Sequence, residues 1–189
     1  MHIGKLHIYC LDRFFIFIKI NSRLGKHQTF IFINIRRSII AKTHFFSYNV
    51  EKFRAYSASE HGVQIDLIVR GICCLIPGQS YSRNIRVTRI VDSFLEHARI
   101  WYFGNGGKPK LFLGSPDWMR RNLYRRIEAV TPILDPDLKR ELSDMLSIQL
   151  SDKRKACFVD DHLRNRWKSA RPQKEKIRSQ YTFYEYLKG

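Results

Sequence analysis

One stretch of the sequence, FLEHARIWYFGNGGKPKLFLGSPDWMRRN (94–122), combines residue types that suit phosphate chemistry. His97 has an imidazole that can act as a nucleophile, or accept and donate a proton, near neutral pH. Arg99 lies two positions on, and at the start of a strand the two side chains share a face. Ser115 and Asp117 end the following strand, so a hairpin would bring them back near His97. The order histidine, arginine, hairpin, serine and aspartate therefore predicts an anion site.

More arginines surround this stretch. Arg70 ends a separate predicted strand, and Arg120, Arg121, Arg125 and Arg126 follow Asp117. Guanidinium groups suit phosphate oxygens because they offer planar, paired donors.

Each of these side chains also has a plainer interpretation. His97 could pair with Glu96 or a backbone carbonyl, and Arg70 could pair with Asp92 or Asp117. Arg126 and Glu128 could pair with each other or support a phosphate pocket, and the sequence leaves this open.

The charge balance narrows the partners. The 189 residues carry 34 Lys and Arg against 17 Asp and Glu, which gives a formal net charge of +17. Residues 1–50 hold eight of these bases against Asp12 alone, so +10 remains on residues 51–189. Such an excess predicts an anionic partner, which could be a nucleic acid, an acidic membrane or a polyphosphate chain.

The cysteines and the apolar runs indicate a cytoplasmic protein. The four cysteines form no CxxC pair and are expected to be reduced thiols (Cys10, Cys73, Cys74 and Cys157). No apolar run approaches the ~18–20 residues that a membrane span needs. The first residues also lack the features of a signal peptide.

Two compositions are joined in the chain. Residues 1–50 form an Ile- and Phe-rich basic extension of unclear structure, whose runs FFIFIKI (14–20) and TFIFINI (29–35) are typical of strands. Residues 51–189 predict one α/β domain with a mixed β-sheet flanked by helices. We expect helices at 50–62, 171–189 and from Asp135 onward, a helical turn at 92–97, a hairpin of 99–103 with 110–115, and strands at 63–69, 85–91, 126–133 and 155–159.

The motif HAR…GSPD resembles the His-x-Lys…Gly-Ser-x-Asn signature of the phospholipase D superfamily, with Arg99 in the lysine place and Asp117 in the asparagine place. From about residue 51 to the end, the chain also resembles the C-terminal domain of bacterial polyphosphate kinase. The matching segments are GVQIDLIVRGICCLIPG, NIRVTRIVDSFLEHARIWYF, LGSPDWMRRNLYRRIEAVTPILDP and KIRSQYTFYEYLKG. This resemblance implies a phospholipase D-like half-domain.

The resemblance also implies an activity. Members of that family transfer the ATP γ-phosphoryl group reversibly to polyphosphate through a phosphohistidine, with two such domains facing each other. The phosphorylated histidine lies in the first domain, and His97 matches the acid/base histidine of the second. Arg70 matches the arginine that contacts the nucleotide phosphates. The implied ATP and phosphate site comprises Arg70, His97, Arg99, Ser115, Asp117 and Arg121, with His97 catalytic.

The chain also departs from the family pattern. The upstream two-thirds or more is missing, and with it the phosphorylated histidine and the residues associated with Mg²⁺. Pro116 and Arg120 stand where the family usually has Ala and Pro. ATP, ADP and polyphosphate are the implied ligands, and the chain alone is expected to be inactive unless another chain supplies the missing domain.

Two alternatives remain. Two copies could pair their His97 residues, as single-motif phospholipase D-like nucleases do, or the chain could be a basic module that only binds polyanions. Replacement of His97 separates them, because a binding module should tolerate it.

Overall fold

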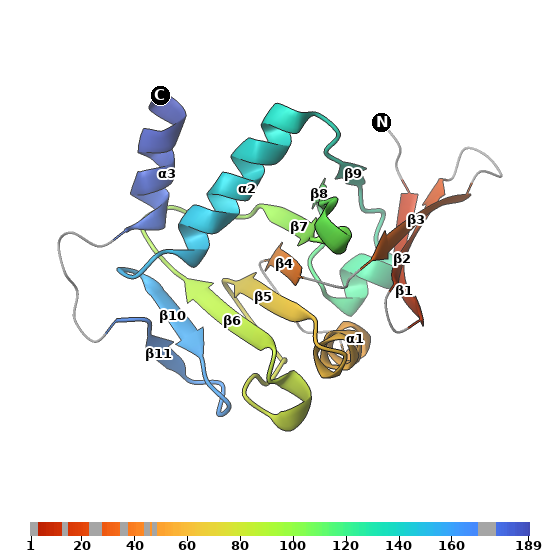
Figure 1. The fold of residues 1–189 in the computed structure, drawn as a ribbon, viewed down its shortest axis with the longest axis horizontal. Coiled ribbons are helices and arrows are strands. Elements are labelled where there is room, and N and C mark those ends of the chain that lie inside the picture. Colours follow the sequence, from red (N-terminus) through yellow and green to blue (C-terminus); the bar gives the residue numbers. More distant parts are fainter. Residues whose placement is uncertain are drawn as a thin grey trace.

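The computed structural model describes residues 4–12, 15–22, 28–34, 38–43, 46, 49–169 and 177–189. These residues form two β-sheets and three α-helices (Figure 1). The strands are β1 (Gly4–Asp12), β2 (Phe15–Ser22), β3 (Gln28–Asn34), β4 (Ser38–Thr43), β5 (Gln64–Val69), β6 (Ile85–Ile90), β7 (Arg99–Phe103), β8 (Lys110–Gly114), β9 (Val130–Pro132), β10 (Ala156–Val159) and β11 (Asn165–Trp167). The α-helices are α1 (Asn49–Glu60), α2 (Pro136–Leu150) and α3 (Ser179–Lys188), and the shorter helical turns are η1 (Ser80–Ser82), η2 (Asn105–Gly107) and η3 (Arg121–Arg125).

The larger sheet has eight strands in the order β11-β10-β6-β5-β4-β7-β8-β9. Its three central strands, β6, β5 and β4, run parallel, and every other neighbour is antiparallel. The smaller sheet is an antiparallel meander of β1, β2 and β3. The large sheet is therefore mixed, as the sequence predicts.

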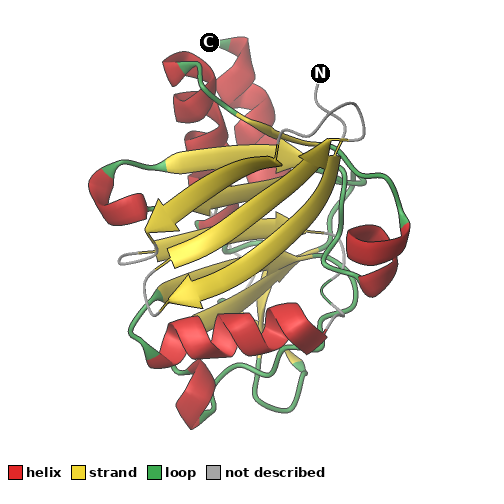
Figure 2. Ribbon diagram, turned by 90° about the vertical axis from the view of Figure 1, so that its right-hand side faces the viewer, coloured by secondary structure: helices red, strands yellow, loops and turns green. Residues whose placement is uncertain are grey.

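The central strands are buried on both faces by helices (Figure 2). Alternate side chains of β5 enter two cores, because successive residues of a strand point to opposite faces. Leu67 and Val69 pack with α1 residues such as Ala55. Ile68 instead packs with α2 residues such as Leu146.

Local signals explain where the helices end and begin. α1 is followed by Gly62, whose φ of 83° is the left-handed conformation that glycine adopts without strain. At the start of α2, the Asp135 side chain accepts hydrogen bonds from the backbone N–H groups of Asp137 and Leu138, and Pro136 opens the helix. Both boundaries agree with the sequence-based prediction.

The structure confirms most of the predicted elements, including the hairpin of β7 with β8 and the strands corresponding to β5, β6 and β10. The predicted helical turn at 92–97 is wrong, because those residues form bends without helix. The predicted strand at 126–133 shortens to β9. Of the predicted C-terminal helix at 171–189, residues 171–176 lie outside the described residues, and α3 begins only at Ser179.

The predicted extension contains more order than its composition suggested. The two Ile- and Phe-rich runs correspond to β2 and β3, although residues 14 and 35 lie outside the described residues. β4 also lies within residues 1–50, yet it pairs with β5 on one side and β7 on the other. The domain boundary between residues 50 and 51 stays a prediction.

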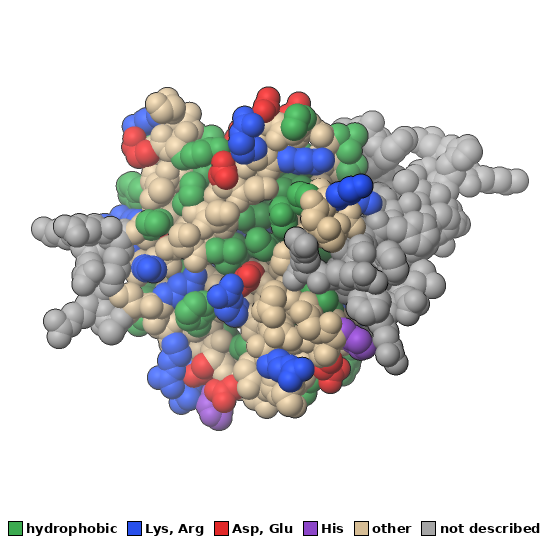
Figure 3. Space-filling view, viewed as in Figure 1, with side chains coloured by type: hydrophobic (Ala, Val, Ile, Leu, Met, Phe, Trp, Pro, Cys, Tyr) green, Lys and Arg blue, Asp and Glu red, His purple; other side chains and the backbone are tan. Residues whose placement is uncertain are grey.

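The C-terminal helix α3 is tied to the domain by two buried carboxylates. Arg178, directly before α3, pairs with Asp92, whose side chain is 1% exposed. The backbone N–H of Ser179 donates to Asp152 at 2.7 Å. On the face shown in Figure 3, hydrophobic side chains gather over α2 and α3. The exposed large hydrophobic residues of these helices include Leu138, Tyr181 and Tyr184.

None of the helices in the described ranges is long and apolar enough to cross a membrane.

Gly114 ends β8 where the chain turns toward the predicted site. A Cβ at this position would lie 2.8 Å from Trp101 ring carbons and 2.9 Å from Val130 Cγ2. Because Trp101 is buried, we expect Gly114→Ala to lower the free energy of unfolding by about 1–3 kcal/mol in urea denaturation. Leu113→Ala, at the neighbouring exposed position, is the matched control and should cost less. An unchanged midpoint for Gly114→Ala would show that Trp101 can move.

The Asp92–Arg178 pair predicts a pH dependence. Hydrogen bonding from Arg178 lowers the pKa of Asp92 below its ordinary value, and the charge of Lys155 adds to this effect. A lowered pKa stabilises the fold fully above the unfolded value of about 3.9, and the contribution is lost as pH falls through the folded pKa. Asp92→Asn should therefore destabilise the protein at pH 6 and have a smaller effect at pH 3. An equal loss of unfolding free energy at both pH values would contradict this assignment.

Candidate active site

Five of the six predicted site residues, all but Arg121, meet at one edge of the large sheet. β4 and β5 run parallel and end there, at Thr43 and just before Arg70. β7 runs antiparallel to β4, so its first residue, Arg99, starts at the same edge. The β7–β8 register pairs Arg99 with Gly114, which places Ser115 beside the His97 segment. The hairpin therefore returns the Gly-Ser-x-Asp motif to the histidine, as predicted.

The centre of this edge is an ion pair between Arg99 and Asp117. Arg99 Nε donates to Asp117 Oδ1 at 3.1 Å and Nη2 donates to Oδ2 at 2.9 Å. The side chains are only 12% and 5% exposed. Thr43 Oγ1 adds a hydrogen bond of 3.0 Å to Asp117 Oδ1. The carboxylate thus fixes the guanidinium in a two-pronged geometry and ties β4 to β7.

His97 lies on the exposed side of this pair. Arg99 Nη2 lies 2.8 Å from His97 Nε2, and Nη1 lies 3.2 Å from Nδ1. A neutral imidazole has one acceptor nitrogen, so Arg99 donates to whichever ring nitrogen carries no proton. Of the plainer pairings for His97, Glu96 is directed elsewhere, to Lys42 and Gln149. The arginine thus connects the histidine to the buried carboxylate.

Arg70 stands at the end of β5 and is half-buried. Its Nη1 is buried and has no hydrogen-bond partner among the described residues. The two carboxylates considered as its partners are taken by other arginines, since Asp117 pairs with Arg99 and Asp92 pairs with Arg178. A guanidinium with an unpaired N–H is a ready donor to an oxyanion.

Ser115 holds the loop that follows β8. Its hydroxyl donates to Glu128 and accepts from the backbone N–H of Ala129 at 3.0 Å. Asn122 Nδ2 donates to the other Glu128 oxygen at 2.7 Å. Glu128 thus accepts hydrogen bonds from Ser115 and Asn122, so its buried carboxylate joins the two ends of the 115–128 loop.

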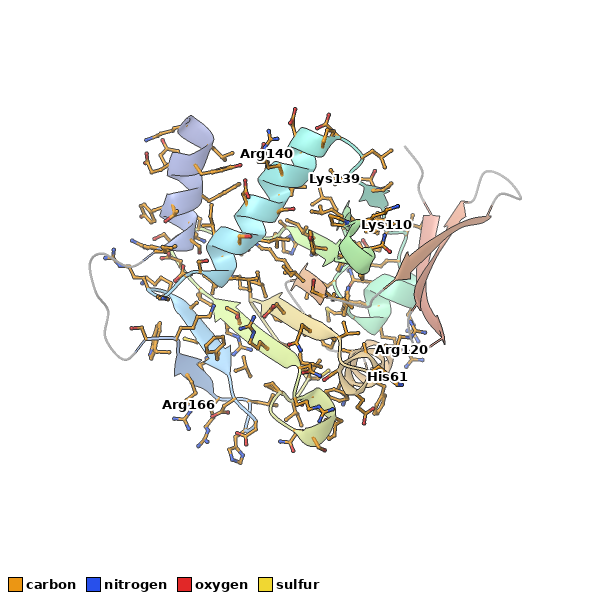
Figure 4. The ribbon with its side chains drawn as sticks, viewed as in Figure 1. His61, Lys110, Arg120, Lys139, Arg140 and Arg166 are labelled. Atoms are coloured by element: carbon orange, nitrogen blue, oxygen red, sulfur yellow. The ribbon has the colours of Figure 1, made fainter. Side chains whose placement is uncertain are left out.

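The structure does not bring Arg121 into this cluster. Arg121 begins η3, its side chain is exposed, and it makes no ion pair with the described residues. Cations labelled in Figure 4 come from several elements, with Arg120 before η3, Lys110 on β8, Lys139 on α2 and Arg166 on β11.

A second buried cluster lies beside the site, and sequence reasoning missed it. Lys42, the residue before Thr43 on β4, is 4% exposed and pairs with Glu96. Gln149 on α2 donates to the same Glu96 oxygen at 2.5 Å. Burial lowers the pKa of Lys42, and the Glu96 charge opposes this effect. The segment SIIAKT (38–43) is a short apolar run typical of a strand, and this pattern could have predicted a place in the sheet for Lys42.

The described residues contain no group of three or more side chains that could hold a metal ion. They therefore do not fit a Mg²⁺ site, and no step of the chemistry is derived through one. Cys73, Cys74 and Cys157 form no disulfide with one another, and burial raises the pKa of the Cys73 thiol to about 11. The Cys10 side chain lies outside the described residues.

Removal of Asp117 should be severe. Asp117→Ala leaves the Arg99 guanidinium buried without its counter-ion, so we expect a loss of about 3–5 kcal/mol in the free energy of unfolding. Asp117→Asn should cost less, because an amide oxygen still accepts a hydrogen bond. Asp137→Ala removes an exposed pair with Arg140 and should cost at most about 1 kcal/mol. If urea denaturation gave equal losses for Asp117→Ala and Asp137→Ala, the ion pair would not organise this edge.

Comparison with known proteins identifies the family. Residues 48–180 match the family described as polyphosphate kinase C-terminal domain 2. The polyphosphate kinase of Escherichia coli K12 is 47% identical over 137 residues, which is 72% of this chain and 20% of that protein. The crystal structure of polyphosphate kinase from Porphyromonas gingivalis is 53% identical, with a TM-score of 0.77 over 80% of this chain and 23% of that one.

A phospholipase D family member, Nuc from Salmonella typhimurium, is 15% identical, with a TM-score of 0.48 over 61% of this chain and 78% of that one. Compared with the curated polyphosphate kinases that it matches, the chain spans about a fifth of their length. With a family match over more than half of its residues, this chain belongs to the polyphosphate kinase family, as its C-terminal domain 2.

Proposed function

We propose that this chain supplies one half of a phosphoryl-transfer site that moves the ATP γ-phosphoryl group to and from polyphosphate. The observation that carries the proposal is the edge that joins β4, β5 and β7. There, the exposed His97 contacts Arg99, a guanidinium held by Asp117, and Arg70 keeps a buried N–H without a partner among the described residues. Both guanidinium groups can neutralise phosphate oxygens, and the imidazole can exchange a proton.

Each predicted site residue has a distinct proposed part. His97 acts as acid and base and contacts a phosphate, and Arg70 contacts the nucleotide phosphates. Asp117 and Ser115 act as positioning residues, because Asp117 accepts hydrogen bonds from Arg99 and Ser115 donates one to Glu128. Arg99 stabilises charge beside the imidazole. Arg121, being exposed and outside the cluster, is proposed only as a more distant contact for a long polyanion.

The substrates follow from this assignment. ATP, ADP and inorganic polyphosphate are the proposed ligands, and ATP brings Mg²⁺ on its own phosphates rather than through side chains of this chain. A cytoplasmic location agrees with the use of ATP. The phosphorylated histidine would come from another domain, supplied by another chain, or from a second copy of this one.

Phosphate binding can be tested on the chain alone. We expect Arg70→Ala to weaken the binding of tripolyphosphate by about 10- to 100-fold in calorimetry, because a charge-assisted hydrogen bond contributes about 1.5–3 kcal/mol. Arg166→Ala is the matched control, since Arg166 is an exposed arginine on β11 that pairs with Asp160. Equal weakening by the two variants would indicate binding through net charge alone and would favour a general polyanion-binding module.

Transfer needs a complete site. We would place residues 38–189 into the polyphosphate kinase of Escherichia coli in place of its matching segment, and supply γ-labelled ATP with short polyphosphate. The chimera should transfer label from ATP to polyphosphate and lengthen it, and His97→Ala should reduce the rate of this transfer by about 10²- to 10⁴-fold. His162→Ala, which removes an exposed histidine of the β10–β11 hairpin, should leave it unchanged.

Full activity in the His97→Ala chimera would overturn the catalytic role. The unfused chain should transfer no label. Label transferred by the unfused chain in a His97-dependent manner would instead mean that two copies pair to form the site.

A further inference from the structure

The segment that carries His97 lacks regular secondary structure. Residues 91–98 join β6 to β7 without a helix or a strand, so no ladder fixes their backbone. Backbone N–H and C=O groups of such a segment need other partners. A catalytic side chain on it needs a supporting shell, because small displacements of a reacting group are costly.

The N-terminal part of the C-terminal helix α3 holds the first residues of this segment. Arg178 Nε donates to Asp92 Oδ2 at 2.8 Å, and its Nη2 donates to Asp92 Oδ1 at 2.6 Å. The same Nη2 donates to Ser93 Oγ at 2.8 Å. Arg178 also stacks over the Tyr181 ring, 4.1 Å from its centroid. The Arg178 guanidinium therefore holds the side chains of Asp92 and Ser93 from a position outside the sheet.

Gln180, in the first turn of α3, acts on the backbone itself. Phe94 N–H donates to Gln180 Oε1 at 2.9 Å, and Gln180 Nε2 donates to the Phe94 carbonyl at 2.8 Å. One side-chain amide thus replaces both hydrogen bonds that a neighbouring strand would make. The centroids of the Phe94 and Tyr181 rings lie 6.1 Å apart, which adds an aromatic contact between the segment and α3.

Glu96, next to His97, is held by residues of β4 and α2. Its carboxylate pairs with Lys42 of β4 and accepts from Gln149 of α2. Every second residue before His97 is thus held by a contact from another element: Asp92, Phe94 and Glu96. Two of the three anchors come from the start of α3.

The attachment of α3 does not depend on these contacts alone. Ser179 N–H donates to the buried Asp152, and Tyr186 Oη donates to Asp144 Oδ2 of α2 at 2.9 Å. Asp152 also accepts from the backbone N–H groups of residues 154, 155 and 156. The contacts to the His97 segment can therefore be removed while α3 stays docked.

We propose that Arg178 and Gln180 are positioning residues that set the placement of His97, which makes the C-terminal helix a structural part of the phosphate site. The inference rests on the proposed function for the chemistry of His97, but the placement itself is measurable without turnover. Neither residue touches the reacting groups. Both act through Asp92 and Phe94.

The test compares His97 in Gln180→Ala, Arg178→Lys and a control. Lys188→Gln is the matched control, because Lys188 is an exposed residue of the same helix that pairs with Glu185. The readout is the imidazole signal of His97 in proton–carbon NMR spectra, assigned by its absence in His97→Ala. Thermal unfolding checks the fold, and protection of α3 amides from exchange checks docking.

We expect Gln180→Ala to shift and broaden the His97 signal and to weaken tripolyphosphate binding by about 5- to 10-fold, with α3 still protected. Arg178→Lys keeps the charge but loses the fork, so it should give a smaller change in the same direction. Lys188→Gln should change neither signal nor affinity. An unmoved His97 signal in Gln180→Ala would overturn the inference.

Two outcomes separate this inference from the proposed function. A shifted His97 signal with unchanged tripolyphosphate affinity would keep the positioning role and count against phosphate binding at His97. An unmoved His97 signal in Gln180→Ala, together with activity in the chimera that depends on His97, would overturn the positioning role and keep the proposed function.

Discussion

The site depends on one buried carboxylate, that of Asp117. It receives both prongs of Arg99 and the hydroxyl of Thr43, so a single group joins the loop after β8 to the start of β7 and the end of β4. An arginine held in this way cannot swing away to solvent, and its remaining N–H groups face His97. The geometry is costly to assemble, because both charges leave water, and it is stable only while both partners are present. That constraint explains why the edge is built from paired residues rather than from single cations.

The charged groups around this edge are sorted into pairs. Asp92 goes to Arg178, Glu96 goes to Lys42, and Asp117 goes to Arg99. Among these neighbours, Arg70 keeps an N–H without a partner among the described residues. The edge thus combines three carboxylates that are committed to cations with one buried guanidinium N–H that is left uncommitted. The net charge of +17 contributes attraction at long range, but it does not select the site.

Much of this arrangement could be read from the sequence. The hairpin of β7 and β8 was predictable from strand-forming runs on either side of a glycine-rich turn, and it alone brings Asp117 back to the histidine. The lone N–H of Arg70 and the partners of Glu96 were not predictable, because they depend on which side chains from distant strands reach the same edge. Lys42 and Gln149 lie 54 and 53 positions from Glu96 in the chain. The expected helical turn at 92–97 failed for the same reason, since Gln180 satisfies the Phe94 backbone that a helix would have satisfied locally.

The central place of β4 has a consequence for how the chain folds during synthesis. β4 is the first strand of the large sheet to be made, yet it must be paired on both sides. Its parallel partner β5 follows after one helix, but its antiparallel partner β7 is completed only about 60 residues later. At ~5–20 residues per second, one edge of an apolar strand stays open for several seconds on the ribosome. An open edge of this kind invites pairing with another chain, so the nascent protein should depend on chaperones more than its finished sheet would suggest.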